Sequence, residues 1–250
     1  MEFLKRIPTL DGLRGILALT VMLGHAVKLA QDHGPVEQVL SSLAGISVLF
    51  FFAMSSHVLT RAWDGRFLPF LARRFVRLWP TYAACLTLGY GLVGRMPIWS
   101  EYVWYPISES AVDPPNWSLC VEAFAMLWMP AIIWSAGGKN YGRLALGVAL
   151  WVALTLLNVK FVVGGCFLLG AALSHIEPRL ALLEGSVVQW LGKVSYSLYL
   201  SHWLVLSAAA TAFGSRGAIA AIPLTLVVAW GVWWAIERPS IALSRRIVTT

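Results

Sequence analysis

The chain has 250 residues, of which 58% are hydrophobic and only 12% are charged, and its formal net charge is +7. A soluble domain carries about 25% charged residues, so this composition excludes an ordinary soluble protein. In a chain of this kind the net positive charge does not indicate nucleic-acid binding. Long apolar stretches recur along the whole chain without the alternation of a barrel strand. The sequence therefore predicts an all-α, polytopic transmembrane helical bundle that forms a single membrane domain over residues 1–250.

The apolar stretches predict about eight transmembrane helices. The two shortest are separated by a turn that holds only Asn158 and Lys160. One long helix is the alternative, but it would invert every later helix and place three C-terminal arginines outside, against the charge rule. The predicted helices cover residues 12–30, 39–60, 78–94, 117–136, 142–157, 161–174, 190–213 and 218–236.

The distribution of Lys and Arg predicts the orientation. With a cytoplasmic N-terminus, fifteen of these side chains fall inside and only Lys28, Arg95, Lys160 and Arg216 fall outside, which is a strong positive-inside bias. Both termini are then cytoplasmic, in a multi-pass protein of the inner (cytoplasmic) membrane. The N-terminus resembles a signal peptide, but no small-residue cleavage site follows, which favours an uncleaved first helix.

Three ionisable side chains share one face of the first predicted helix. Arg14 and His25 are separated by about 20° on the helical wheel and roughly 16 Å along the axis, and Asp11 projects nearby. Because ionisable groups at membrane depth are costly, a shared face favours a polar cavity. The alternative is an Asp11–Arg14 pair that anchors the helix end, together with a satisfied histidine.

An arginine cluster precedes the third predicted helix in the segment FLARRFVRLWPTY, read here as a loop. Arg73, Arg74 and Arg77 lie at the predicted cytoplasmic surface. Arginine forks suit phosphates, so the cluster is a candidate dock for a phosphorylated cytoplasmic cofactor. The alternative is a positive-inside anchor on anionic lipid.

Polar side chains also mark the segment DPPNWSLCVEAF. Trp117 suits a membrane interface, and Glu122 falls in a first turn where the helix dipole favours an acid. The predicted topology places this end outside, on the side that His25 approaches. Glu122 is then a candidate to charge-balance a histidine or to bind a hydroxylated acceptor, and the alternative is a plain capping acid.

A further polar stripe lies in the seventh predicted helix. Ser195, Tyr199 and His202 follow at i, i+4 and i+7 and share a face. They are candidates to line a polar cavity, or alternatively to form hydrogen bonds between helices. The three cysteines, in contrast, show neither CxxC nor Cys/His spacing, so no metal site is predicted.

Six segments, in order, resemble the motifs of the acyltransferase-3 family, which are integral membrane O-acyltransferases that modify polysaccharides and related glycans. The resemblance runs from about residue 7 to 240. Members commonly have ten helices, and a second acid where this chain has Ala123. The segments are RIPTLDGLRGILALTVMLGH, FFAMSSHVLTRAW, RRFVRLWPTY, NWSLCVEAF, LGKVSYSLYLSHW and AIERPS.

The resemblance implies roles for these residues. His25 corresponds to the catalytic histidine of an Arg-x10-His pattern that begins at Arg14, and Asp11 and Glu122 join the catalytic set. The arginines Arg14, Arg73, Arg74 and Arg77 are implied to hold the donor, which is usually acyl-CoA and most often acetyl-CoA. An exported or lipid-linked glycan is the implied acceptor. Its candidate contacts are Trp117, Ser118, Glu122, Ser195, Tyr199 and His202.

Two other functions are compatible with these residues. Intramembrane ionisable groups also mark solute and ion paths in transporters and channels, although no paired half-helices are evident in the sequence. A catalytically silent relative that binds a glycolipid is the other alternative.

Overall fold

The computed structural model describes residues 6–31, 34–103, 112–138, 140–157 and 162–247, and over these residues it contains helices and no strand. The predicted all-α class is thereby confirmed. The predicted turn at Asn158 and Lys160 lies outside the described residues, but the helices on either side of it are separate and pack together. The α-helices are α1 (Pro8–Leu29), α2 (Pro35–Arg61), α3 (Phe67–Val93), α4 (Trp99–Tyr102), α5 (Trp117–Ala136), α6 (Tyr141–Leu157), α7 (Gly164–Ala172), α8 (Ser186–Phe213), α9 (Gly217–Ala220), α10 (Ile222–Val232) and α11 (Arg238–Arg246).

Shorter helical turns complete the described chain. A 3-10 turn at Pro114–Asn116 leads into α5, and further 3-10 turns lie at Leu173–His175 and Ala181–Leu183. A π-helical turn at Trp233–Glu237 joins α10 to α11. The predicted single helix 218–236 is therefore replaced by α9, α10 and this π turn, because Pro223 at the start of α10 lacks the amide hydrogen needed to continue a helix from before it.

Within the described part of the chain, three helical stretches qualify as membrane spans by length and composition: Pro8–Leu29, Pro35–Arg61 and Pro114–Ala136. The helices α6 and α7 are apolar but shorter. The total of about eight spans thus stays a prediction.

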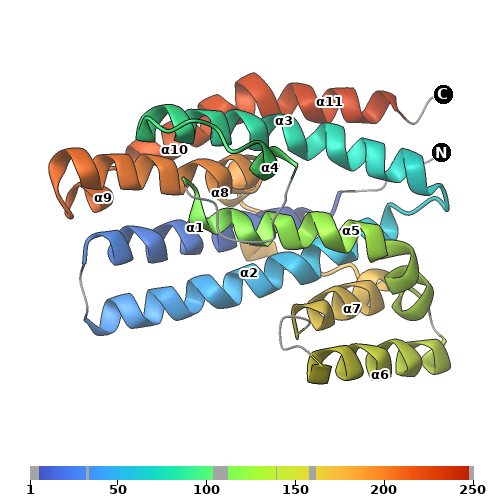
Figure 1. Ribbon diagram of the computed structural model, residues 1–250. Helices are drawn as coiled ribbons and strands as arrows, with labels where there is room; N and C mark the ends of the chain where they lie inside the picture. The colour runs from blue at the N-terminus through green and yellow to red at the C-terminus, as the bar shows by residue number, and fades with distance from the viewer. Residues whose placement is uncertain (1–5, 32–33, 104–111, 139, 158–161, 248–250) are drawn as a thin grey trace.

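The first helix packs along α8 and α2 at the centre of the bundle (Figure 1). Small residues allow this close approach, as is usual between membrane helices. A Cβ atom added to Gly15 would lie 2.5 Å from the backbone nitrogen of Gly192, and one added to Gly192 would lie 2.3 Å from the carbonyl oxygen of Asp11. The α1–α8 crossing therefore depends on glycine on both helices, and it fixes α1 against the helix that carries Tyr199 and His202.

The third helix begins earlier than the sequence predicts. It starts at Phe67 rather than residue 78, so the arginine-rich segment expected to be a loop forms its first turns. Pro80 lies inside the helix instead of at its start. A proline in a helix costs a hydrogen bond but is tolerated in membrane helices, where neighbouring groups satisfy the freed carbonyl.

The fifth helix begins inside the bundle instead of at its outer end. The Tyr199 hydroxyl donates to the carbonyl of Pro115, just before α5, over 3.2 Å and lies 2.7 Å from the hydroxyl of Ser118 in the first turn of α5. Tyr199 lies near the middle of the long helix α8. Figure 1 shows α5 starting short of the end that α2 and α9 reach. The first turn of α5 is consequently placed at mid-height, although the sequence predicted an interfacial start.

Candidate functional site

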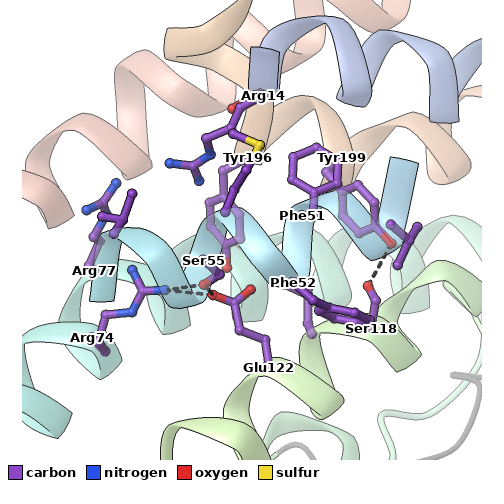
Figure 2. A pocket seen from close by; sticks show the side chains of 15 residues that line it. Arg14, Phe51, Phe52, Ser55, Arg74, Arg77, Ser118, Glu122, Tyr196 and Tyr199 are labelled. Carbon is purple, nitrogen blue, oxygen red and sulfur yellow. Dashed lines mark hydrogen bonds and ion pairs between the residues drawn. The ribbon is translucent and has the colours of Figure 1, made fainter. Parts of the chain in front are cut away.

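A polar pocket lies between α1, α2, α3, α5 and α8. Figure 2 shows its arginines on one side and Phe51 and Tyr199 on the other, with Glu122 between them. Five separate helices thus contribute to one site. The polar and charged residues that line it are Arg14, Ser55, Arg74, Arg77, Ser118, Glu122, Ser195, Tyr196 and Tyr199.

Glu122 forms an ion pair with Arg74. The carboxylate oxygen lies 2.6 Å from the Arg74 guanidinium and accepts a 2.5 Å hydrogen bond from the Ser55 hydroxyl. Both charged side chains are largely buried, with 13% of Arg74 and 20% of Glu122 exposed. The sequence suggested that Glu122 balances a histidine. The structure pairs it with an arginine instead, because α5 begins at mid-height and brings Glu122 level with the first turns of α3.

The other two pocket arginines have no such partner. Within the described part of the chain, the side chains of Arg14 and Arg77 make no hydrogen bond and no ion pair. A further negative charge, that of Glu237, interacts electrostatically with both. Its carboxylate accepts hydrogen bonds from the backbone and the hydroxyl of Ser197, at 3.2 and 2.5 Å. Two guanidinium groups therefore face the pocket with free donors.

Two of the residues predicted for the site point elsewhere. Asp11 accepts a 2.8 Å hydrogen bond from Arg6 and does not line the pocket. Arg73 donates to Asp64 over 3.1 Å. Burial alone would raise the pKa of Asp64, but hydrogen bonds from Arg73 and from the backbone of Arg66 hold it below its usual value. Arg73 thus secures the turn between α2 and α3, and Arg74 and Arg77 are the members of the cluster that reach the pocket.

His25 and His202 form a pair beyond the aromatic end of the pocket. His25 Nδ1 lies 2.8 Å from His202 Nε2, and the two rings are nearly parallel, at 14°, with centroids 5.1 Å apart. The His25 ring is half-buried and meets the edge of Trp203, whereas His202 is fully buried. Neither histidine lines the pocket itself.

Tyr199 lies between the pocket and the histidine pair. Its ring packs against Phe51 in the pocket and against the ring of His202, with centroid distances of 5.8 and 5.7 Å. Its hydroxyl lies 2.7 Å from that of Ser118 in the first turn of α5. These three residues form one wall of the site. We call Phe51, Tyr199 and Ser118 together the aromatic wall. Two other residues were predicted as acceptor contacts. Ser195 lines the pocket one turn before Tyr199 in α8. Trp117 does not line the pocket; its ring packs at a steep angle against that of Phe52, which does.

Residues 7–165 match the family model described as an acyltransferase domain, Acyl_transf_3. The chain belongs to the acyltransferase-3 family. The matched region includes Arg14, His25, Arg74, Arg77 and Glu122. No curated protein and no solved structure matches the chain. Family membership and the apolar helices together indicate a membrane acyltransferase.

The structure adds residues in and around the pocket that the sequence did not single out. Ser55 binds Glu122, Tyr196 lines the pocket and donates to the Leu78 carbonyl, and Glu237 provides the second carboxylate. The signal for Glu237 was present in the sequence, since an acid beside an apolar helix marks a functional candidate. Ser55 and Tyr196 carried no such signal, because serine and tyrosine are common in membrane helices.

Proposed function

We propose that the protein is a multi-pass inner-membrane O-acyltransferase, with cytoplasmic termini and surrounded by membrane lipid. It moves an acyl group, with acetyl the first candidate, from cytoplasmic acyl-CoA to a hydroxyl of an exported or lipid-linked glycan. The observation that supports this most is the juxtaposition of free arginines with a histidine pair. Arg14 and Arg77 face a half-buried pocket without partners, and Tyr199 links that pocket to His25 and His202.

The arginines suit the donor. Coenzyme A carries several phosphate charges, and a guanidinium binds phosphate oxygens with short, charge-assisted hydrogen bonds. Arg14 and Arg77 provide the free donors, and Arg74 adds a third charge that Glu122 holds in place. The partly buried setting reduces screening by salt. Arg73 and Asp11 take no part in this scheme, since their partners hold them outside the pocket.

The histidine suits the chemistry. In its neutral form His25 takes the proton of the acceptor hydroxyl while the oxygen attacks the thioester carbonyl, and the carbon–sulfur bond then breaks. The departing thiolate receives that proton from His25, so the enzyme returns to its starting state. General base catalysis of this kind contributes about 10²–10⁴-fold. The alternative, in which His25 carries the acyl group covalently before passing it on, uses the same residue.

Acyl transfer in membranes tests the proposal. Membranes that contain the wild-type protein are incubated with radiolabelled acetyl-CoA and a crude glycolipid extract, and His25→Ala serves as the comparison. We expect label in the glycan with the wild type only, at equal amounts of folded protein. Ordinary transfer by His25→Ala would refute both the base and the acyl-carrier roles.

Binding of coenzyme A separates this proposal from transport of an unrelated solute. An acyltransferase binds coenzyme A whether or not the acetyl group and the chosen extract are the right substrates. Absence of both transfer and coenzyme A binding would overturn the proposed donor.

A further inference from the structure

The strongest unassigned feature is the histidine pair itself, because the contacts of His202 determine where the protons of both rings lie. This inference rests on the proposed role of His25. It assigns a function to His202 that neither the sequence nor the family match provides, since the match ends at residue 165.

The first step concerns His202 Nδ1. This nitrogen lies 2.6 Å from the carbonyl oxygen of Tyr199 and 3.2 Å from that of Leu198. A carbonyl oxygen only accepts hydrogen bonds, so Nδ1 must carry a hydrogen. His202 is fully buried, and an uncompensated charge there would be costly, so its ring is neutral. Its Nε2 atom then has a lone pair and no hydrogen.

The second step passes this constraint to His25. Because His202 Nε2 accepts, the 2.8 Å contact requires the hydrogen on His25 Nδ1. A neutral His25 with its hydrogen on Nδ1 has a free lone pair on Nε2, as a general base requires. The backbone of α8 thereby selects the reactive form of a side chain on α1. When His25 takes up a proton at Nε2, its Nδ1–H still donates to His202, which stabilises the resulting cation.

We propose that His202 is a positioning residue, which holds the His25 ring and fixes its hydrogen on Nδ1 so that Nε2 is free to accept the proton of the acceptor hydroxyl. This is the task that an aspartate performs in a Ser-His-Asp triad, carried out here by a neutral acceptor. The predicted role of His202 as an acceptor contact is replaced, because both of its nitrogens already have protein partners and its surface is fully covered.

The tautomer is measured directly by ¹⁵N NMR on the purified protein with labelled histidine. The His25 signals are assigned by their loss in His25→Gln, and His175→Gln, at an exposed site outside the bundle interior, is the control. We expect a non-protonated Nε2 in the wild type and a change toward the Nε2–H form in His202→Leu. A protonated His25 Nε2 in the wild type at neutral pH would overturn the inference, whatever the activity of the protein.

Kinetics then tests the consequence. His202→Leu removes the acceptor and should lower kcat by about 10²-fold while the KM for acyl-CoA is little changed, since the arginines are untouched. His202→Gln places a carbonyl oxygen near the position of Nε2 and should retain clearly more activity than His202→Leu. Equal loss in both variants, or a change in KM alone, would contradict a positioning role.

The two measurements keep the inference separate from the proposed function. If the wild type transfers no acyl group to any glycan, the function fails, but the NMR result still decides the tautomer. If the wild type is active and His202→Leu is equally active, the function stands and the inference fails.

Discussion

Three guanidinium groups share the pocket region with two carboxylates. The positive charges of the three arginines are not equally balanced by negative partners. Arg74 has a direct partner in Glu122, whereas Arg14 and Arg77 make no ion pair and only interact through space, Arg77 with Glu122 and Glu237 and Arg14 with Glu237. Arginines that look alike in the sequence therefore have different roles, and their replacement should have different effects.

Arg77→Gln should weaken the binding of acyl-CoA with little change in thermal stability. A hydrogen bond to a charged group contributes about 1.5–3 kcal/mol, so we expect the Kd for coenzyme A to rise about 10–100-fold. Arg66→Gln, at an exposed position just before α3, is the matched control. Titration of both proteins in detergent measures the effect, and equal affinity in the two variants would contradict the assignment.

Arg74→Gln should affect stability as well as affinity. It leaves the Glu122 carboxylate without its cation in a largely buried place, at a cost of about 1–3 kcal/mol. The double variant Arg74→Gln/Glu122→Gln removes both charges and should recover part of the lost melting temperature. A double variant no more stable than Arg74→Gln would show that the pair is not coupled.

The sequence predicted many of these residues but not their partners. It identified Arg14, Arg74, Arg77, Glu122 and Tyr199, all of which line one pocket. It also assigned Arg73 to the donor, as a member of the arginine cluster and by the family resemblance. Spacing along a helix places the Cα atoms, but a long arginine side chain follows its nearest carboxylate, which is Asp64 on the preceding turn.

At the scale of the helix, the crossing of α1 and α8 controls the site. Gly12 and Gly15 on α1 face α8, and His25 and His202 meet further along the same interface. Any change that separates the two helices also separates the two histidines.

Gly15→Ala should therefore reduce both stability and activity. The new methyl group would lie 2.5 Å from the backbone of Gly192, and overpacking of this kind costs about 1–3 kcal/mol. Gly91→Ala is the control, because a Cβ there meets nothing within 4 Å. Melting temperature and acyl transfer are measured for both variants. A stable, fully active Gly15→Ala protein would show that α1 has room to move.

The helices themselves were more predictable than their ends. Long apolar runs predicted α1, α2, α5 and α8 closely, because a membrane-depth helix needs about 20 such residues. The start of α3 was missed because the arginine-rich segment before residue 78 was read as a loop, whereas it forms the first turns of the helix. The start of α5 was predicted correctly in the chain but wrongly in space, because only the contacts of Tyr199 with Pro115 and Ser118 place it at the middle of the bundle.

At the scale of the whole molecule, the orientation in the membrane is the main open prediction. The 28 residues of α8 extend about 42 Å at 1.5 Å per residue, which exceeds a hydrocarbon core of about 30 Å. Figure 1 shows the start of α1 and the end of α11 toward the same end of the bundle. The shared end fits termini on one side of the membrane. That this side is the cytoplasm stays a prediction from the positive charges.

Labelling of introduced cysteines tests this orientation. Ser215→Cys, just after α8, should react with a membrane-impermeant maleimide on intact cells. Gly185→Cys, just before α8, should react only after permeabilisation. The wild type gives the background, because Cys85 and Cys120 are buried and Cys166 is half-buried. The reverse pattern would place the arginine pocket on the opposite side and exclude a cytoplasmic donor.

The aromatic wall of Phe51, Tyr199 and Ser118 has a consequence for the hydrolysis of the thioester donor by water. A thioester held beside an activated base is open to hydrolysis, and water is present at far higher concentration than any glycan. In the structure, the ring of Tyr199 lies between the pocket and the histidines, and its hydroxyl is held by Ser118 and the Pro115 carbonyl. With the donor behind that ring, the enzyme should release little free coenzyme A until an acceptor arrives, and its donor would be protected from futile hydrolysis.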